Sequence, residues 1–198
     1  AALQGLVLEG LEPAVASAYA AALVRLADVG AVIEPLELDA LAEVGRINVR
    51  GGFSSAELYA RLRDRLATGA RALDPRVLRR VNMGAEHAEG DYAGFQVARA
   101  RLIADAAGLD RFDAVLMPTA PMVAPRFDEL EADADYDRIN RLALRNASIA
   151  NMLDRCAISV PCEPMGGLPI GLTLMGRRDG DRDLLAIAAG LEAVIRGA

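Results

Sequence analysis

The sequence predicts an α/β fold in which a mixed β-sheet is flanked by helices. Three observations lead to this class. Short segments rich in Val, Ile and Leu alternate with longer segments whose apolar residues recur at helical spacing. A strand–helix–strand pattern opens the chain, and two short apolar segments near its end are separated only by a Gly- and Pro-rich stretch. At 198 residues the chain is long enough for one domain, 1–198, which would bury roughly 70% of its unfolded surface.

The first strand–helix–strand unit is expected over residues 6–36. Leu6–Leu8 is a short apolar run that predicts a buried strand. Pro13 suits the first turn of a helix, and apolar residues follow it at helical spacing until Gly30 ends the pattern. Ala31–Leu36 predicts the second strand. Two strands joined by a helix are expected to pair in parallel, with the helix as the crossover.

The middle of the chain is predicted to be helical. Ser54 and Glu57 have the spacing of a capping box before a run of leucines. Asp74 followed by Pro75 predicts the start of a second helix, and Asp91 that of a third, which ends near Gly108.

The last third returns to strands and ends in a helix. The expected elements are a strand at 112–117 with a rigid Pro-Thr-Ala-Pro loop after it, an exposed acidic connection at 126–137, a helix at 137–151, strands at 157–160 and 170–175, and a closing helix from Asp181 to Ile195.

Composition excludes several classes of function. The net charge of −6 and the isoelectric point near 4.9 argue against a nucleic-acid partner, because phosphates require a basic face. No apolar run approaches the roughly 18 residues that span a membrane, so no membrane partner is expected. Two cysteines are too few for a disulfide framework, which favours a reducing cytoplasm. The chain has no lysine, since arginine supplies all 22 basic residues, so any mechanism that needs a lysine is unavailable within it.

The start of the sequence favours a piece of a larger protein. The first residue is Ala1, an apolar run follows within a few residues, and the mean hydropathy is +0.21. Apolar surface meant for an absent partner would explain this hydropathy. A complete alanine-rich domain is the alternative.

Metal, redox and phosphate sites are not expected. A predicted strand of about 20 Å separates Cys156 from Cys162, whereas disulfide-bonded Cα atoms lie within about 7 Å. The Gly/Pro stretch after Cys162 lacks the lysine of a phosphate-binding loop, and the aspartates from Asp133 to Asp137 lack the glycine and glutamate of a calcium loop. We therefore expect structural cysteines, a loop between two strands, and no metal or cofactor.

The remaining polar candidates leave alternatives open. Ser54 or Ser55 with His87 and an acid would make a hydrolytic triad, although a capping serine and a solvated histidine at a polar helix end explain the same residues. The pairs Arg79-Arg80 and Arg145-Asn146 would suit a carboxylate or carboxamide, and surface salt bridges are the simpler interpretation.

Several segments of the chain together resemble one enzyme family. They are FDAVLMPTAP at 112–121, AISVPC at 157–162, GLPIGLTLMG at 167–176, DRDLL at 181–185 with Glu192, LDPRVLRRVNMG at 73–84 followed by Asp91-Tyr92, and the 12–34 unit. The pattern resembles the C-terminal portion of the amidase signature family, over nearly the whole chain and most specifically from 112 to 192. Asp154-Arg155-Cys156 departs from it, since many relatives have Gly-Leu-Pro there.

The resemblance implies an enzyme that acts on carboxamide C–N bonds. Members of the family use a serine nucleophile, a second serine in a cis peptide and a lysine, all upstream of the portion that this chain resembles. The chain would then shape the substrate pocket and be inactive without the N-terminal part of the same protein. The substrate-binding residues implied are Arg80, Thr119 and Arg145, and the implied partner is a small-molecule amide.

Other functions remain open at this point. One is the A component of a tRNA-dependent amidotransferase, which the Asp154-Arg155-Cys156 departure disfavours relative to a stand-alone amidase. A second is a non-catalytic binding or assembly module with an amidase-like fold, and a third is a self-contained hydrolase that uses His87. A homodimer also stays open.

Overall fold

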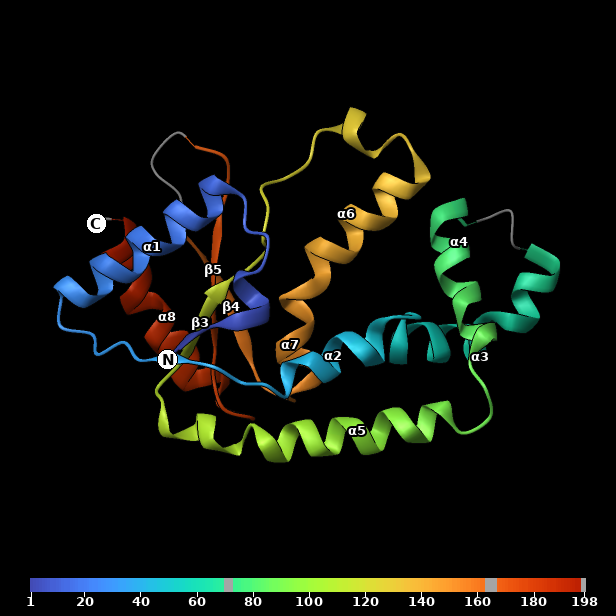
Figure 1. Ribbon diagram of the computed structural model, residues 1–198, viewed down its shortest axis with the longest axis horizontal. Helices are drawn as coiled ribbons and strands as arrows, with labels where there is room; N and C mark the ends of the chain where they lie inside the picture. The colour runs from blue at the N-terminus through green and yellow to red at the C-terminus, as the bar shows by residue number, and fades with distance from the viewer. Residues whose placement is uncertain (70–72, 163–166, 197–198) are drawn as a thin grey trace.

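Five short strands form one mixed sheet in the computed structural model, which describes residues 1–69, 73–162 and 167–196 (Figure 1). The strand order is β2-β1-β3-β5-β4. β1 pairs in parallel with β2 and β3, whereas β5 pairs antiparallel with β3 and β4. The α/β class with a mixed sheet is thus confirmed. The strands are β1 (Ala2–Leu3), β2 (Pro35–Leu36), β3 (Val115–Pro118), β4 (Ala157–Pro161) and β5 (Gly171–Met175).

The predicted parallel pair with a crossover helix is present at the start of the chain. α1 (Pro13–Asp28) joins β1 to β2, and Pro13 is its first residue. α1 packs beside the closing helix α8 (Asp181–Arg196) on one face of the sheet. Their apolar sides meet Leu172 and Leu174 of β5, neither of which is exposed to solvent. This layer contains one of the two apolar cores.

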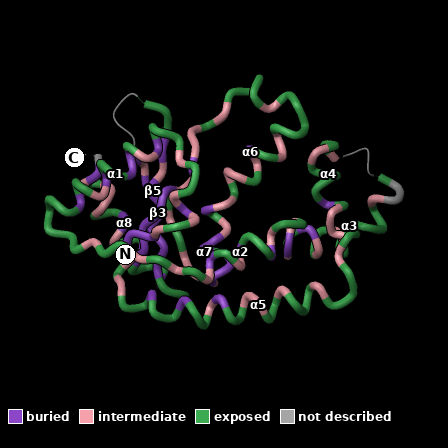
Figure 2. The backbone as a smooth tube through the Cα atoms, in the orientation of Figure 1, coloured by how far each residue is buried: buried purple, intermediate pink, exposed green. Residues whose placement is uncertain are grey.

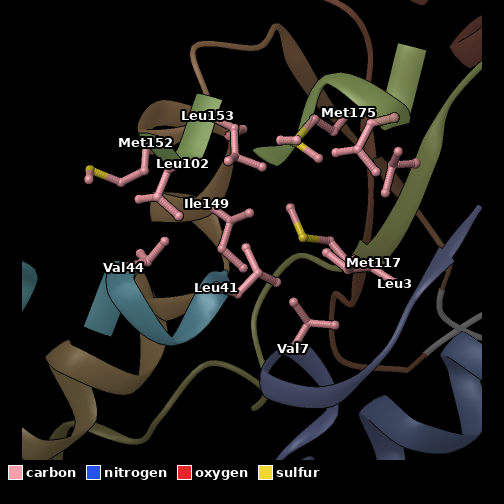
Figure 3. Packing of buried hydrophobic residues seen from close by; sticks show 14 of the residues in the cluster. Leu3, Val7, Leu41, Val44, Leu102, Met117, Ile149, Met152, Leu153 and Met175 are labelled. Carbon is pink, nitrogen blue, oxygen red and sulfur yellow. The ribbon is translucent and has the colours of Figure 1, made fainter. Parts of the chain in front are cut away.

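The opposite face of the sheet is covered by other helices. α2 (Leu41–Asn48), α5 (Asp91–Asp105) and α7 (Ala147–Met152) contribute to the second core together with Met117 and Met175. Figure 3 shows Leu3 and Met117 from the sheet facing Leu41 of α2 and Ile149 of α7. Because side chains alternate along a strand, Thr173 shares this face with Met175. The burial pattern in Figure 2 places most of the buried backbone in these two layers.

A helical arm lies away from the sheet at the far end of α5 (Figure 1). It consists of α3 (Gly52–Gly69), α4 (Pro75–Asn82) and the short 3-10 helix η3 (Met83–Glu86). Asp74 caps α4 by accepting hydrogen bonds from the backbone N–H groups of Arg76 and Val77, which confirms the predicted start of this helix.

Ion pairs join the arm to α6 (Asp133–Arg145). Arg76 Nε lies 3.1 Å from Asp133 Oδ1, and Arg79 Nη1 lies 2.8 Å from Asp133 Oδ2. Arg79 also reaches Asp137 at 3.3 Å. These two arginines hold the pKa of the exposed Asp133 carboxyl below its ordinary value, with Arg76 the larger influence.

The structure corrects the predicted strand at Leu6–Leu8. Gly5–Leu8 is a 3-10 helix, and the strand is Ala2–Leu3. Val7 is fully buried, so the apolar run does enter the core, but as one turn of helix. A run of three apolar residues has no period that distinguishes these outcomes. The other predicted strands are present, although β2 and β3 start several residues later than expected and β5 starts one residue later.

Two helical predictions were also wrong in detail. α3 begins at Gly52, so Ser54 and Glu57 lie inside it and form no capping box; Glu57 accepts a hydrogen bond from Tyr92 Oη at 2.7 Å instead. The helix predicted at 137–151 is two helices, α6 and α7, which meet at Asn146. α6 also takes in part of the acidic connection at 126–137, which is mostly exposed as expected.

The Gly/Pro stretch lies partly outside the described residues, at 163–166. On either side of it, β4 and β5 pair antiparallel from Ala157 opposite Met175 to Pro161 opposite Gly171. The two predicted strands are therefore confirmed as neighbours.

Candidate functional site

Three hydroxyl groups meet at the carboxyl end of β3. Thr119 follows the last residue of that strand, and Ser159 of β4 is the register partner of Thr173 of β5. Thr119 Oγ1 lies 2.6 Å from Ser159 Oγ and 2.8 Å from Thr173 Oγ1. We call these three residues the hydroxyl cluster. Thr173 is 6% exposed, Thr119 is half-buried and Ser159 is exposed, so the cluster runs from the interior to the surface.

A glycine makes room for the hydroxyl cluster. Gly171 lies beside it on β5, and the backbone N–H of Thr119 donates to the Gly171 carbonyl at 2.8 Å. A Cβ at this position would collide with Ser159 Oγ and come within 2.6 Å of Thr119 Oγ1. The strand therefore needs a residue without a side chain where the hydroxyls approach its backbone.

The hydroxyl cluster opens into a cleft of about 440 Å³. Its remaining walls come from the loop after β3, from α6 and from the ends of β4 and β5, and among the described residues that line it there is no charged side chain. The lining residues are Thr119, Ala120, Met122, Val123, Ala124, Pro125, Ala143, Ser159, Pro161, Pro169, Ile170 and Gly171. A largely apolar hollow with a few convergent polar groups is the usual form of a small-molecule site. We call it the hydroxyl cleft.

Thr119 is the one predicted substrate-binding residue that lines this cleft. Arg145 is half-buried at the end of α6, where its Nε donates to Asn146 Oδ1 at 3.1 Å and its Nη2 to the Val7 carbonyl at 3.4 Å. Burial lowers the pKa of the Arg145 guanidinium, and a nearby Glu9 opposes this effect. Arg80 lies exposed on α4 in the helical arm. The structure thus does not bring the three residues into one site.

Asn146 is a buried junction that the sequence indicated only as a neighbour of Arg145. Its side chain is fully buried, and Nδ2 donates to the carbonyls of Val7 at 3.1 Å and Pro118 at 2.8 Å. These bonds hold the break between α6 and α7 against the end of β3. Asn146 therefore fixes the direction in which the chain leaves β3 toward Thr119.

His87 is not the solvated histidine that its polar neighbours suggested. Its side chain is only 7% exposed; Nε2 lies 3.0 Å from Ser55 Oγ, and Nδ1 lies 3.8 Å from Asp91 Oδ2. The ring also meets Phe95 edge to face at 5.3 Å. Close packing of η3 against α3 explains why the His87 ring is buried. Gly84 of η3 lies so near Ser55 of α3 that a Cβ on Gly84 would collide with the Ser55 backbone.

A serine, a histidine and an aspartate are thus together, but the geometry favours a structural role. Ser55 is 2% exposed, which leaves no room for a substrate at its hydroxyl. Ser55 Oγ also lies 2.8 Å from the Arg50 carbonyl, an acceptor that its single proton can satisfy. When that proton is used on the Arg50 carbonyl, the contact with His87 requires Nε2 to be the donor, and a protonated Nε2 cannot act as the base for Ser55.

The cysteines match the structural interpretation in part. Cys162 is buried, while Cys156 is partly exposed and donates from Sγ to the Arg177 carbonyl at 3.1 Å. Among residues 1–69, 73–162 and 167–196, no group of three or more His, Cys, Asp or Glu side chains is placed to hold a metal ion. In the same ranges no helix is long and apolar enough to cross a membrane.

Ser159 and Thr173 were missed as site residues. Each is the single hydroxyl residue of an otherwise apolar strand, Ser159 in β4 and Thr173 in β5. The two are register partners, and Thr173 lies on the same face of β5 as Gly171 and Met175. That signal is present in the sequence, but it becomes a site only when the register places Ser159 opposite Thr173 and the end of β3 beside both.

Comparison with known proteins identifies the fold and the family. The Amidase family model matches residues 1–185. The 2-amino-5-chloromuconic acid deaminase of Comamonas testosteroni is 33% identical over 189 residues, and a glutamyl-tRNA(Gln) amidotransferase component of Symbiobacterium thermophilum is 25% identical over 216. Each alignment covers 94% of this chain but only 41% and 42% of the relative. The chain therefore spans about two fifths of the length of these curated relatives.

Solved structures of other proteins resemble the fold of this chain over nearly its whole length. An allophanate hydrolase of Kluyveromyces lactis superposes with a TM-score of 0.83 at 26% identity, covering 98% of this chain and 32% of that one. A structure described as an amidase superposes with a TM-score of 0.75 at 23% identity, covering 97% and 44%. With the family model matching nearly the whole of the described sheet and its helices, the chain belongs to the Amidase family.

Proposed function

We propose that this chain is the C-terminal portion of an amidase that hydrolyses carboxamide C–N bonds, with the reacting serines and lysine in another part of the same protein. One observation carries the proposal: a chain that the Amidase model matches over residues 1–185 contains no lysine. A lysine that serves as a base must lose its proton near neutral pH, and an arginine with a pKa above about 12 does not replace it.

The proposed role of this portion is to form part of the substrate pocket. The hydroxyl cleft supports this role, because it combines apolar walls with Thr119, which we infer to contact the substrate. Arg145 and Arg80 are proposed to face substrate only when the remaining part of the protein is in place. Two cysteines are too few for a disulfide framework, which fits a reducing compartment, proposed to be the cytoplasm.

A component of a tRNA-dependent amidotransferase is the second candidate. It is favoured by the Symbiobacterium thermophilum relative, whose alignment also covers 94% of this chain. Asp154-Arg155-Cys156 weighs against it, since it departs from the pattern of many relatives. In the structure Asp154 pairs with Arg99 at 2.9 Å, and Arg155 with Asp110 at 2.6 Å, so this segment ties the end of α7 to α5 and to the 3-10 helix η4 (Ala107–Arg111) that follows α5.

The test compares two proteins from one reading frame. The 198-residue chain and a version extended upstream in the gene are purified, and the release of ammonia from small carboxamides is measured for both. We expect turnover by the extended protein only, and loss of that turnover when an upstream lysine is replaced by alanine. Hydrolysis by the 198-residue chain alone at a comparable rate would contradict the proposal.

A further inference from the structure

The hydroxyl cluster holds one more proton than its own hydrogen bonds use. Thr119, Ser159 and Thr173 each supply one hydroxyl proton, and two contacts, both to Thr119 Oγ1, join them. In the part of the chain that the structure describes, none of the three hydroxyls has a further hydrogen-bond partner. One O–H group therefore remains available to a ligand.

Burial decides where this proton lies. If Ser159 donated to Thr119 and Thr119 to Thr173, the unused proton would sit on Thr173, which is 6% exposed, and a buried unpaired donor is costly. The reverse direction, from Thr173 through Thr119 to Ser159, leaves it on the exposed member. In that chain Thr119 both donates and accepts, and consecutive hydrogen bonds polarise one another. A third arrangement, in which both neighbours donate to Thr119, lacks this gain.

The walls of the hydroxyl cleft indicate which acceptor fits. None of the lining residues that the structure describes carries a charge, and the other walls include Met122, Val123, Pro125 and Ile170. A carboxylate there would lose water without gaining a cation, which is unfavourable. An uncharged carbonyl group on an aliphatic chain would gain both the hydroxyl donor and the apolar contact.

We propose that Ser159 Oγ donates a hydrogen bond to the carbonyl oxygen of an uncharged aliphatic carboxamide bound in the hydroxyl cleft, with Thr119 and Thr173 orienting the hydroxyl. Ser159 is thereby a specificity residue, and Thr173 a positioning residue that the ligand does not touch. The choice of a carboxamide rests on the proposed function, whereas the donor and the absence of charge rest on the geometry. Gly171 supports the assignment, because a side chain at this position would take the space that the hydroxyls of Ser159 and Thr119 occupy.

The test is a direct binding measurement on the 198-residue chain and requires no turnover. Isovaleramide and isovalerate, which differ in charge at the same position, are titrated while the methyl NMR signals of Thr119, Val123 and Ile170 are followed. We expect saturable shifts with isovaleramide and markedly weaker ones with isovalerate. Equal binding of the two compounds, or no binding of isovaleramide, would overturn the proposal.

Variants then locate the donor. Ser159→Ala should weaken isovaleramide binding about three- to tenfold, the range for one hydrogen bond, while Ser159→Thr keeps the hydroxyl and should restore it. Thr173→Val should weaken binding by a smaller factor through the loss of orientation. Ser17→Ala, which alters an exposed serine of α1 outside the cleft, is the matched control and should bind as the unaltered chain does.

The two proposals fail in different ways. If Ser159→Ala binds isovaleramide as tightly as the unaltered chain, the donor assignment is wrong, whatever the extended protein hydrolyses. If the extended protein shows no amide hydrolysis while Ser159→Ala still loses binding, the proposed function is wrong and the hydroxyl donor stands. Amide-proton spectra of each variant show that it is folded before binding is compared.

Discussion

Replacing Asn146 by alanine should destabilise the fold more than its small size suggests. The side chain makes three hydrogen bonds: two from Nδ2 to the carbonyls of Val7 and Pro118, and one accepted from Arg145 Nε. At about 1 kcal/mol for each bond, and with the amide fully buried, the loss is about 3 kcal/mol. For a chain of this length such a loss lowers Tm by roughly 6–12 °C.

Urea and thermal unfolding, followed by circular dichroism, measure this loss. The control is Asn151→Ala on α7, an exposed asparagine, which should change stability by no more than about 0.5 kcal/mol. The Asn146→Ala variant should also loosen the loop after β3, so the methyl signal of Thr119 should shift. If Asn146→Ala unfolds within about 1 °C of the control variant, the buried junction does not hold α6, α7 and β3 together as we describe.

Three further predictions concern single side chains. His87→Ala removes the hydrogen bond to Ser55 and a buried ring, so it should lower the free energy of unfolding in urea by about 2 kcal/mol. It should leave amide hydrolysis by the extended protein unchanged. A loss of hydrolysis would instead support a catalytic triad that includes His87. Burial raises the pKa of Tyr19 from 10 to about 12. As the pH rises, the unfolded chain loses the Tyr19 proton before the folded chain does, so the free energy of unfolding should fall by about 2–3 kcal/mol between pH 10 and pH 12. Tyr19→Phe should remove this part of the decline. An equal decline in the unaltered chain and in Tyr19→Phe would contradict the prediction. The pKa of Asp133 is lowered, so its ion pair with Arg76 should stabilise above the ordinary value of 3.8 and be lost as the pH falls through the lowered one. Asp133→Asn should abolish that acid dependence in thermal melts at low salt, and an unchanged profile would refute it.

The fold could be predicted from sequence where a pattern was long. The period of the apolar residues in α1 and α8 extends over 16 residues in each, and both helices lie where expected. The short elements were less predictable. Leu6–Leu8 is too short to have a period, and α2 was not predicted, because its eight residues include Gly45 and carry no strong start signal. Tertiary packing decides such segments, since β1 and the first 3-10 turn are held by neighbours from distant parts of the chain.

The candidate site was predictable only in part. Thr119 was found because it follows a strand and a rigid proline loop. Ser159 and Thr173 lie 40 and 54 residues further along the sequence, and only the antiparallel register of β4 and β5 brings them to Thr119. His87 was misjudged for a similar reason. Its sequence neighbours are polar, whereas its neighbours in space are Ser55 of α3 and Phe95 of α5.

The edge position of β4 affects how the isolated chain would behave in solution. Among the described strands β4 has a partner on one side only, and its five residues, Ala157–Pro161, include no charge. Natural sheet edges are commonly protected by charged residues or prolines, and here only Pro161 serves, at the end of the strand. Edge-to-edge aggregation at high concentration is the expected consequence. Ala157 is the exposed residue at which a lysine would protect this edge without entering the hydroxyl cluster.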